Sequence, residues 1–568
     1  MISDKHCIQQ LAAVLLQHGI CDVILSPGSR NAPLITTFTQ IKEFNCLSIV
    51  DERSAAFFAL GMAQWKQKPV VICCTSGSAV LNYAPAISEA YYQKVPLIII
   101  TADRPERWIG QSDGQTIDQK DIYRNYIKKS FNIPEAFTSP EEEWYCNRTI
   151  NEAINSACYP EPGPVHLNIP LSEPLYGQTE ETLPVVRKIE LIKGERWLNE
   201  SDRTILENKW KASARKLIIV GQTAPDPSLN GLFEQLAQDP SVSILTETTS
   251  NIRSEGIHTS IDNILFTLTE EETKTFSPDI LITFGGQIVS KRVKAFLRKN
   301  PPKEHWFFSI SGAHVDTFQC LTTLIDTSPG DILKDLAKLD HPLSAYAELW
   351  QKRDELTRFR SKEYLRNCPF SDLTVFNLIT EKIPAGYVVH TSNSTPVRYA
   401  QLVSMPDHII YFANRGTSGI DGSVSTAAGS AYASKSPTLL ITGDLSFFYD
   451  SNALWNRYLT SEFKIILINN GGGGIFRIIE GPSTSPALEE YIETGHSQSA
   501  RQLAEGFGVH YLSAKNHQET EFALNRLFKE KGPALLEIFT TGKLNAPILN
   551  NYFSFLKTGT KDYLRIEI

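Results

Sequence analysis

The chain has 568 residues, of which 42% are hydrophobic and 21% charged, and its formal net charge is −8. This length predicts about three domains with well-buried cores, and the composition is that of an ordinary globular protein. The acidic balance argues against nucleic acid or an anionic membrane surface as a partner. It also makes any cluster of arginines and lysines near a pocket more informative.

The cysteines favour a reducing compartment. There are nine of them, with no Cys-x-x-Cys pair, and several lie in apolar runs such as Val71-Ile72-Cys73-Cys74. Free cysteine behaves there as a small core residue.

Residues 1–6 do not lead from a basic region into an apolar one, and no apolar stretch approaches the ~20 residues that span a bilayer. We therefore expect a cytoplasmic protein without membrane segments.

Short apolar runs alternate with amphipathic segments along the chain, which predicts parallel sheets of the βαβ type. In the first third we expect strands at 23–25, 47–50, 70–75, 97–101 and 165–169, and helices over 54–66 and 79–93. The middle third repeats the pattern with strands at 217–220, 242–245, 280–284 and 306–310. The last third has strands at 388–390, 438–442, 464–468 and 534–539.

Two segments between these blocks have the character of linkers. Residues 173–187 are polar and contain proline, and residues 340–372 are charged, helical in pattern and broken at Pro369. We expect domains at 1–180, 190–345 and 360–568, without short repeats. The predicted fold class is α/β, with three doubly wound, Rossmann-like domains.

The most informative segment is Gly443-Asp444-Leu445-Ser446, which is followed by Asn469-Asn470 and glycines 471–474. An aspartate at the end of one strand and an amide pair at the end of the next can place hard oxygen ligands around one small divalent cation. Mg²⁺ prefers such ligands when it bridges a diphosphate. The glycines allow close approach of the backbone. The alternative is a strand-end aspartate beside a flexible glycine turn, and this segment alone does not decide between the two.

Two loops of the first third carry further candidates. The loop 26–34, with Ser29 and Arg30, joins a strand to a helix and can bind an anion through free backbone N–H groups. A solvated arginine in an ordinary turn is the alternative. Glu52 follows the second strand, where it is either a helix-start charge or a buried glutamate that shares a proton with a cofactor ring.

Six cations lie at expected strand ends or helix starts, although each alone is more often a surface residue or an ion-pair partner. They are Arg30, Arg104, Lys291, Arg292, Arg398 and Arg415. Open α/β sheets bind ligands at the carboxyl ends of their strands, and the guanidinium fork pairs with carboxylates. The set therefore predicts a ligand rich in carboxylates.

Together these segments resemble the thiamine diphosphate enzymes, and among them the branch of menaquinone biosynthesis. The matching pieces are SPGSRNAPL (26–34), DERSAAFFALGMA (51–63), TSGSAVLNYAPAISEA (75–90), TADRP (101–105), GPVHLNIP (163–170), SKR (290–292), NRGTSGIDGSVSTAAG (414–429), GDLSFFYDSNAL (443–454) and NNGGGGIF (469–476). They cover the chain from end to end, in order.

The resemblance implies a pyrimidine-binding, a central and a diphosphate-binding domain. The cofactor, thiamine diphosphate with Mg²⁺ or Mn²⁺, would lie between the first domain of one subunit and the last domain of another. A homodimer or homotetramer would follow. Many members have three asparagines where this chain has Asn469-Asn470-Gly471, and Gly474 replaces a frequent glutamine. The register of this loop therefore stays open by one residue.

The resemblance also implies roles for individual residues. Asp444, Asn470 and the Gly472 carbonyl would hold the metal, and Glu52 would protonate the pyrimidine ring. Around the cofactor would lie Gly443, Leu445, Ser446, Ile475 and Phe476, with Ile420 as the apolar wedge that bends it. The substrates' carboxylates and hydroxyls would contact Ser29, Arg30, Arg104, Gln115, Lys291, Arg292, Ser394, Arg398 and Arg415.

The implied reaction decarboxylates 2-oxoglutarate and adds the succinyl carbanion equivalent to isochorismate in a 1,4 sense. His6 and His18 are the only histidines of the first 160 residues, so the histidine pair of simple thiamine decarboxylases is absent, which favours carboligation. The alternatives are a thiamine carboligase or decarboxylase of another 2-oxoacid, with an apolar pocket, and a catalytically silent α/β protein that binds a nucleotide or diphosphate. A Rossmann dehydrogenase is disfavoured, because no Gly-x-Gly-x-x-Gly follows the first strand.

Overall fold

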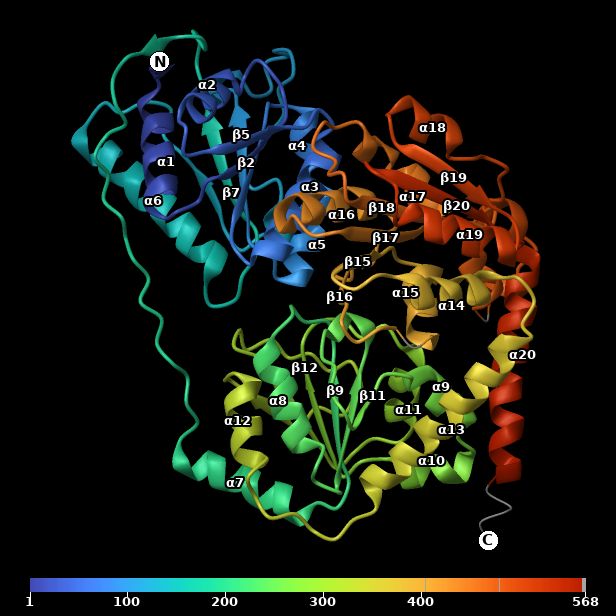
Figure 1. The fold of residues 1–568 in the computed structure, drawn as a ribbon. Coiled ribbons are helices and arrows are strands. Elements are labelled where there is room, and N and C mark those ends of the chain that lie inside the picture. Colours follow the sequence, from blue (N-terminus) through green and yellow to red (C-terminus); the bar gives the residue numbers. More distant parts are fainter. Residues whose placement is uncertain (404, 480, 564–568) are drawn as a thin grey trace.

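The computed structural model describes residues 1–403, 405–479 and 481–563, and within them three six-stranded sheets are formed entirely of parallel pairs (Figure 1). A short antiparallel pair, β1 (Ile2–Ser3) with β8 (Gln178–Thr179), is the fourth sheet of this part of the chain. The three parallel sheets confirm the predicted α/β fold class. The N-terminal and C-terminal sheets lie side by side, and the central sheet lies beneath them in this view.

The N-terminal sheet has the strand order β3-β2-β4-β5-β7-β6. Its strands are β2 (Asp22–Leu25), β3 (Asn45–Ser48), β4 (Val70–Cys74), β5 (Leu97–Asp103), β6 (Ser130–Asn132) and β7 (Val165–Pro170). One face packs against α1 (His6–Gln17), α2 (Ala32–Gln40) and α6 (Pro140–Cys158). The other packs against α3 (Glu52–Lys66), α4 (Ser78–Asn82) and α5 (Ala84–Gln93). The inner strands are therefore buried on both faces, as parallel sheets require.

The C-terminal sheet repeats that topology with the order β16-β15-β17-β18-β20-β19. Its strands are β15 (Val388–Thr391), β16 (Ile410–Ala413), β17 (Thr438–Gly443), β18 (Phe463–Asn469), β19 (His510–Ala514) and β20 (Ala534–Phe539). The helices α14 (Asp372–Lys382), α15 (Thr395–Leu402), α19 (His517–Leu527) and α20 (Gly542–Tyr563) cover one face. The other face packs against α16 (Ser423–Ser434), α17 (Asp444–Tyr449) and α18 (Arg501–Gly506).

The first and last domains share one apolar core, because α3 and α16 pack directly on each other. A Cβ added at Gly61 would lie 1.9 Å from the carbonyl oxygen of Thr426, and one at Gly429 would lie 1.9 Å from that of Phe58. Only glycine permits such an approach of two helix backbones. This contact fixes the two domains relative to each other.

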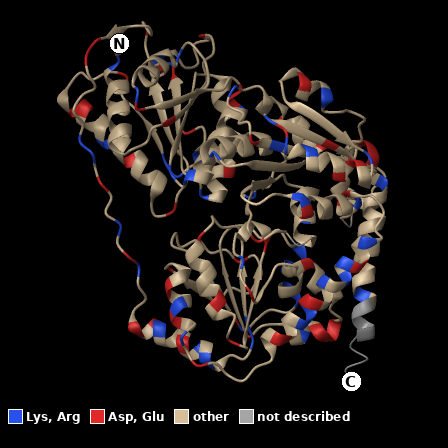
Figure 2. Ribbon diagram, viewed as in Figure 1, with Lys and Arg blue, Asp and Glu red and all other residues tan. Residues whose placement is uncertain are grey.

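The central sheet has the order β11-β10-β9-β12-β13-β14, with strands β9 (Lys216–Val220), β10 (Val242–Thr246), β11 (Ile257–His258), β12 (Ile280–Phe284), β13 (Glu304–Phe308) and β14 (Thr323–Ile325). One face is covered by α7 (Glu200–Ala212), α8 (Pro227–Leu236) and α12 (Pro329–Leu336). The other is covered by α9 (Ile261–Thr267), α10 (Glu270–Phe276), α11 (Lys291–Lys299) and α13 (Tyr346–Arg366). Acidic and basic residues are interspersed along its outer helices (Figure 2). Residues 180–199 connect this domain to the first as a long extended chain.

Every strand expected from the sequence is present, although its ends shift by up to two residues: 47–50 becomes β3, and 306–310 becomes β13. The unforeseen strands of the three parallel sheets, β6, β11, β14, β16 and β19, all lie at sheet edges. An edge strand is short and less apolar, so its pattern is weak.

The helix expected over 79–93 is interrupted at Tyr83, because Pro85 cannot continue the hydrogen bonding of the preceding turn. Residues 340–372 contain α13, whose Trp350 is buried against the central sheet.

Candidate active site

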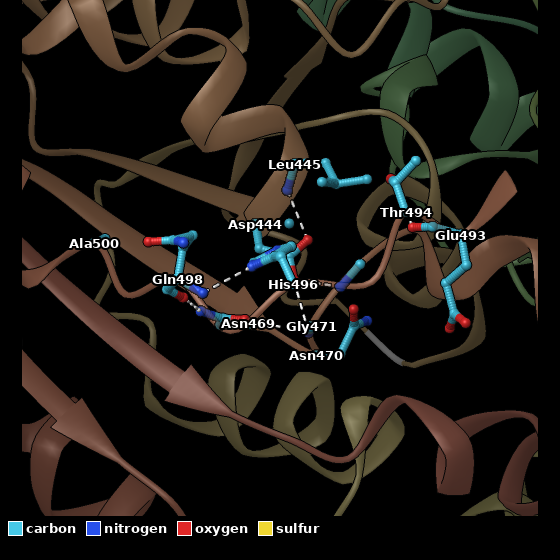
Figure 3. A network of polar contacts seen from close by, with 12 residues as sticks. Asp444, Leu445, Asn469, Asn470, Gly471, Glu493, Thr494, His496, Gln498 and Ala500 are labelled. Carbon is cyan, nitrogen blue, oxygen red and sulfur yellow. Dashed lines mark hydrogen bonds and ion pairs between the residues drawn. The ribbon is translucent and has the colours of Figure 1, made fainter. Parts of the chain in front are cut away.

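Asp444 is held rigidly at the carboxyl end of the C-terminal sheet, where β17 ends and α17 begins (Figure 3). Its Oδ2 accepts hydrogen bonds from the backbone N–H groups of Gly471 (2.8 Å) and Gly472 (3.0 Å). Its Oδ1 accepts from the N–H of Leu445 at 2.6 Å. The carboxylate therefore joins the Gly443–Ser446 segment to the loop after β18.

Asn470 presents a buried oxygen without a partner. Its Nδ2 donates to Asp372 Oδ2 at 2.9 Å, which fixes the amide orientation. Its Oδ1 is buried and makes no hydrogen bond with the described residues. An unsatisfied buried acceptor costs about 1–3 kcal/mol. Such an atom in a native fold is expected where a ligand supplies the missing contact.

Gly472 is the third residue expected to offer an oxygen to Mg²⁺. Its φ of +149° and the 2.8 Å between a built Cβ and the Glu493 carbonyl oxygen exclude a side chain. Asp444, Asn470 and the Gly472 carbonyl offer one carboxylate, one amide and one backbone oxygen. Mg²⁺ is commonly bound by one or two carboxylates plus substrate phosphates and water. Across the described residues no group of three His, Cys, Asp or Glu side chains could hold a metal ion.

His496 is a neighbour of this site that sequence reasoning missed. Its Nε2 lies 3.3 Å from Asp444 Oδ2, and its Nδ1 accepts from the Gln498 N–H at 3.1 Å, which leaves Nε2 as the protonated nitrogen (Figure 3). The Asp444 carboxylate raises the pKa of His496. Nothing in the segment around His496 forms a motif, and only the fold brings it beside β17.

The residues expected along the cofactor lie on three adjacent segments. Ser446 Oγ donates to the backbone oxygen of Ile420 at 2.6 Å, so the loop after β16 is attached to α17. Ile420 is half-buried. Ile475 is buried and Phe476 half-buried in the short helix Gly474–Arg477 that follows the glycines. Ile475 and Phe476 thus follow directly after the loop that carries Asn470 and Gly472.

Glu52 is the first residue of α3, directly after the capping residue Asp51. Asp51 Oδ2 accepts from Asn452 Nδ2 at 2.7 Å, and Arg53 Nη2 donates to the Tyr449 oxygen at 2.7 Å, so the start of α3 lies against the C-terminal domain. Glu52 itself is half-buried, and its carboxylate forms no hydrogen bond or ion pair with the residues described. It is therefore free to meet a ligand.

A first group of predicted substrate residues lies on the N-terminal domain. Arg30 and Arg104 line a cavity of about 430 Å³ together with Arg107 and Trp108. Arg30 donates to the Leu171 oxygen at 2.9 Å and pairs with Glu173 at 3.2 Å. Arg104 pairs with Asp113 at 2.5 Å. Ser29, which precedes Arg30, is exposed to solvent. Gln115, 11 residues after Arg104, is also exposed and has a φ of +57°.

A second group lies where the central domain meets the C-terminal domain. Arg415 donates to Asn393 Oδ1 at 2.8 Å, and its buried Nε has no partner in the described structure. Arg398 donates to the backbone oxygen of Ser394 at 2.5 Å, and Ser394 has an unusual φ of +73° for a residue with a side chain. Arg292 lies against two adjacent aromatic rings, those of Phe266 and Phe553, and Lys291 is exposed beside it. None of the hydrogen bonds or ion pairs in the described parts of the chain joins this group to the first.

Comparisons with known proteins agree with this geometry. Residues 6–122 and 393–538 match the N-terminal and C-terminal thiamine pyrophosphate (TPP) binding domains of thiamine pyrophosphate enzymes, and residues 192–387 match their middle domain. Benzoylformate decarboxylase from Polynucleobacter necessarius shares the fold, with a TM-score of 0.70 at 16% identity over 95% of this chain and 99% of that chain. Fold and domain matches define a thiamine diphosphate enzyme.

Relatives at much higher identity specify the family. The chain is 44% identical to 2-succinyl-5-enolpyruvyl-6-hydroxy-3-cyclohexene-1-carboxylate synthase from Flavobacterium johnsoniae, over 96% of this chain and 98% of that protein. It is 42% identical to the synthase of the same name from Bacteroides fragilis, over 98% and 100%. The chain belongs to this synthase family.

No helix among the described residues is long and apolar enough to cross a membrane.

Proposed function

We propose that the protein binds thiamine diphosphate through one Mg²⁺ or Mn²⁺ held by Asp444, Asn470 and the Gly472 carbonyl. The observation that carries this proposal is the buried, unpartnered Oδ1 of Asn470 beside the immobilised Asp444 carboxylate. These three residues would hold the ion, and diphosphate and water would supply its other ligands. The cofactor would also contact Gly443, Leu445 and Ser446. The apolar side of its binding site would be formed by Ile420, Ile475 and Phe476.

The reaction we propose is decarboxylation of 2-oxoglutarate followed by 1,4-addition of the succinyl unit to isochorismate. The products are CO₂ and 2-succinyl-5-enolpyruvyl-6-hydroxy-3-cyclohexene-1-carboxylate, a precursor of menaquinone. Each substrate carries two carboxylates, which suits the two arginine-rich groups. Arg30 and Arg104 serve one set of carboxylates, with Ser29 and Gln115 beside them. Lys291, Arg292, Arg398 and Arg415 serve the other, with Ser394 at the start of α15.

The protein's contribution is proton placement, orientation and charge. Bound thiamine diphosphate supplies the carbon nucleophile and the electron sink. Glu52, free of protein partners, holds a proton at the pyrimidine ring nitrogen. The guanidinium groups bind the carboxylates bidentately and orient the reacting carbons. The N-terminal domain lacks the histidine pair that would protonate the succinyl unit after CO₂ has left. This favours transfer of that unit to the second substrate.

The division of the site between domains supports an assembly of at least two subunits. Glu52 and the first arginine group belong to the N-terminal domain, whereas the metal ligands and the second group belong to the other two. Pairing one chain's first domain with another chain's last domain would complete two sites in a homodimer; a homotetramer would repeat the arrangement. We propose domain limits of 1–180, 190–345 and 360–568, since each parallel sheet lies within one of these ranges.

The nine free cysteines support a reducing compartment, and we propose the cytoplasm. A second candidate function is carboligation or decarboxylation of a different 2-oxoacid. It keeps the cofactor, Glu52 and the metal ligands. It requires an apolar pocket where the arginine groups stand, and the cavity beside Arg30 and Arg104 disfavours it.

The deciding experiment measures CO₂ release from 2-oxoglutarate with thiamine diphosphate and Mg²⁺, in the presence and absence of isochorismate. We expect fast, isochorismate-dependent release, with loss of isochorismate absorbance. Pyruvate is the control substrate. Release from pyruvate instead would keep the cofactor and overturn the substrate assignment, and no release from either would favour a silent binding protein.

A further inference from the structure

Two carboxylates without a role so far lie behind the second arginine group. Glu247 directly follows β10 and is 1% exposed. Its Oε2 accepts from the N–H of Val289 at 2.6 Å, and its Oε1 accepts from the N–H of Ser290 at 2.7 Å. The two oxygens thus bind consecutive amides of the turn that precedes α11.

The second carboxylate, Asp262, acts on the same turn from α9. It accepts a hydrogen bond from Ser290 Oγ. That hydroxyl in turn accepts from the N–H of Val293 at 3.1 Å, so Ser290 is the capping residue of α11. The first two residues of the capped helix are Lys291 and Arg292. The cap and both carboxylates therefore determine where these two cations leave the backbone.

The direction of Arg292 is fixed as well. Its guanidinium carbon lies 4.5 Å from the ring centre of Phe266 and 4.6 Å from that of Phe553. Cation–aromatic contacts of this kind hold a guanidinium plane without consuming its hydrogen-bond donors. The guanidinium of Arg292 is thus held in one orientation, and its N–H groups remain able to bind a carboxylate.

The same turn is attached to the loop that carries Arg415. Gln287 Nε2 donates to the Gly416 oxygen at 2.8 Å, and Ser418 Oγ donates to Gln287 Oε1 at 3.0 Å. Val289 packs with Val397 and Ala413 in a small apolar cluster. These contacts therefore hold the turn before α11, in the central domain, in place against the Arg415 loop of the C-terminal domain.

The charges around the two carboxylates leave a positive excess. Glu247 interacts electrostatically with Lys294, Arg398 and Arg415, and Asp262 with Arg292 and Arg398. Arg415 also interacts with the buried Glu89, so four cations face three carboxylates and a positive excess remains. Lys294 is occupied, since its Nζ donates to the Ile288 oxygen at 2.7 Å. The excess thus lies on the three arginines.

We propose that Glu247 and Asp262 are positioning residues that hold the start of α11 and the facing arginines ready for a dicarboxylate substrate. Neither carboxylate touches the substrate. Both act through the 289–290 amides and the Ser290 cap, and they offset part of the charge of the arginines while the site is empty. This inference rests on the proposed function, because it assumes that the second arginine group binds substrate carboxylates.

The test compares Asp262→Ala, Asp262→Asn and Glu247→Gln in the full-length enzyme. Asp262→Ala removes the acceptor for Ser290 and should raise the KM for 2-oxoglutarate about tenfold. Asp262→Asn keeps an acceptor and should restore KM to within about threefold of wild type. Glu247→Gln keeps one acceptor oxygen but cannot bind both amides, and should also raise KM about tenfold. For each variant the Kd for thiamine diphosphate should stay within twofold.

Asp354→Asn is the matched control. Asp354 is another buried carboxylate of the central domain, but it pairs with His258 at 3.1 Å and with Arg358 at 3.0 Å, outside the arginine group. It should lower the thermal midpoint without changing KM. An unchanged KM in folded Asp262→Ala and Glu247→Gln would overturn the proposal, as would parallel losses of substrate and cofactor affinity.

Direct binding of succinate by the wild-type holoenzyme and the variants, measured by calorimetry, separates this inference from the proposed function. An enzyme that releases no CO₂ from 2-oxoglutarate but binds succinate, with about tenfold weaker binding in Asp262→Ala, would refute the proposed reaction and keep the positioning roles. Wild-type enzyme that neither turns over 2-oxoglutarate nor binds succinate would overturn both.

Discussion

The N-terminal and C-terminal sheets have the same topology but different chemistry at their carboxyl ends. In both, the second strand in chain order lies at one edge and the sixth between the fourth and fifth. The fourth strand of the N-terminal sheet, β5, ends at Asp103, and the fourth strand of the C-terminal sheet, β18, ends at Asn469, directly before Asn470. Topology alone therefore offers two equivalent ligand positions.

The difference lies in whether the polar atoms at those positions are satisfied. Asp103 accepts from its neighbour's N–H, on Arg104, at 2.7 Å and from Asn168 Nδ2 at 2.8 Å, so both oxygens have partners. Asn470 Oδ1 is buried and has none among the described residues. Because a buried acceptor without a partner is costly, the unpaired oxygen of Asn470 is the better candidate for a ligand contact than the two paired oxygens of Asp103.

The largest effect should come from Glu52→Gln, which tests the chemistry that only the N-terminal sheet supplies. Loss of the proton-sharing carboxylate should lower turnover by about 10²–10⁴-fold, the range of general acid–base catalysis. The Kd for thiamine diphosphate, measured by fluorescence titration, should change little. Turnover near wild type would remove Glu52 from the mechanism.

The comparison of the two fourth strands can be tested with one variant on each. Asn470→Ala removes the unpaired oxygen and should weaken Mg²⁺-dependent cofactor binding about tenfold or more, equivalent to about 1.4 kcal/mol. Asp103→Asn, at the end of β5, should lower the thermal midpoint but leave the Mg²⁺ titration of activity unchanged. Equal metal dependence in both variants would show that the unpaired oxygen is not a ligand.

Arg398→Ala tests the substrate side of the C-terminal domain. Charge-assisted hydrogen bonds contribute about 1.5–3 kcal/mol, so KM for the carboxylated substrate should rise about 10- to 150-fold. The Kd for thiamine diphosphate should change far less. Similar losses of both affinities, measured by steady-state kinetics and titration, would instead assign Arg398 to folding.

The smallest effect concerns pH and stability, and Asp450 of the C-terminal domain should show it. Burial raises the pKa of Asp450 to about 7, although it accepts from Ser425 N–H at 2.7 Å and from Ser425 Oγ at 2.8 Å. A folded-state pKa above the unfolded value of about 3.9 means that the folded protein binds the proton more tightly. The contribution of Asp450 to stability therefore falls as pH rises from about 4 to about 7.

Asp450→Asn removes this titration and keeps an acceptor for Ser425. Thermal midpoints of the variant and wild type should diverge in favour of the variant as pH increases from 5 to 8. The measurement is scanning fluorimetry at fixed ionic strength. Parallel curves over this range would mean that Asp450 does not titrate there.

The sequence by itself determined the α/β class and all inner strands, because parallel strands buried on both faces are continuous apolar runs. The strand-end aspartate and the amide pair indicated a possible metal site, and the resemblance to thiamine diphosphate enzymes implied Asp444, Asn470 and Gly472 as its ligands. Edge strands such as β14 and β19 were missed, because half-solvated strands carry a weaker pattern.

Only the tertiary structure decided which side chains are saturated and which are free. It separated the six strand-end cations into two groups, paired Arg30 and Arg104 with Glu173 and Asp113, and placed Glu247 and Asp262 behind α11. It also brought His496 to Asp444 from a segment without any motif. These contacts join residues distant in sequence, and no local pattern encodes the partner of a polar atom.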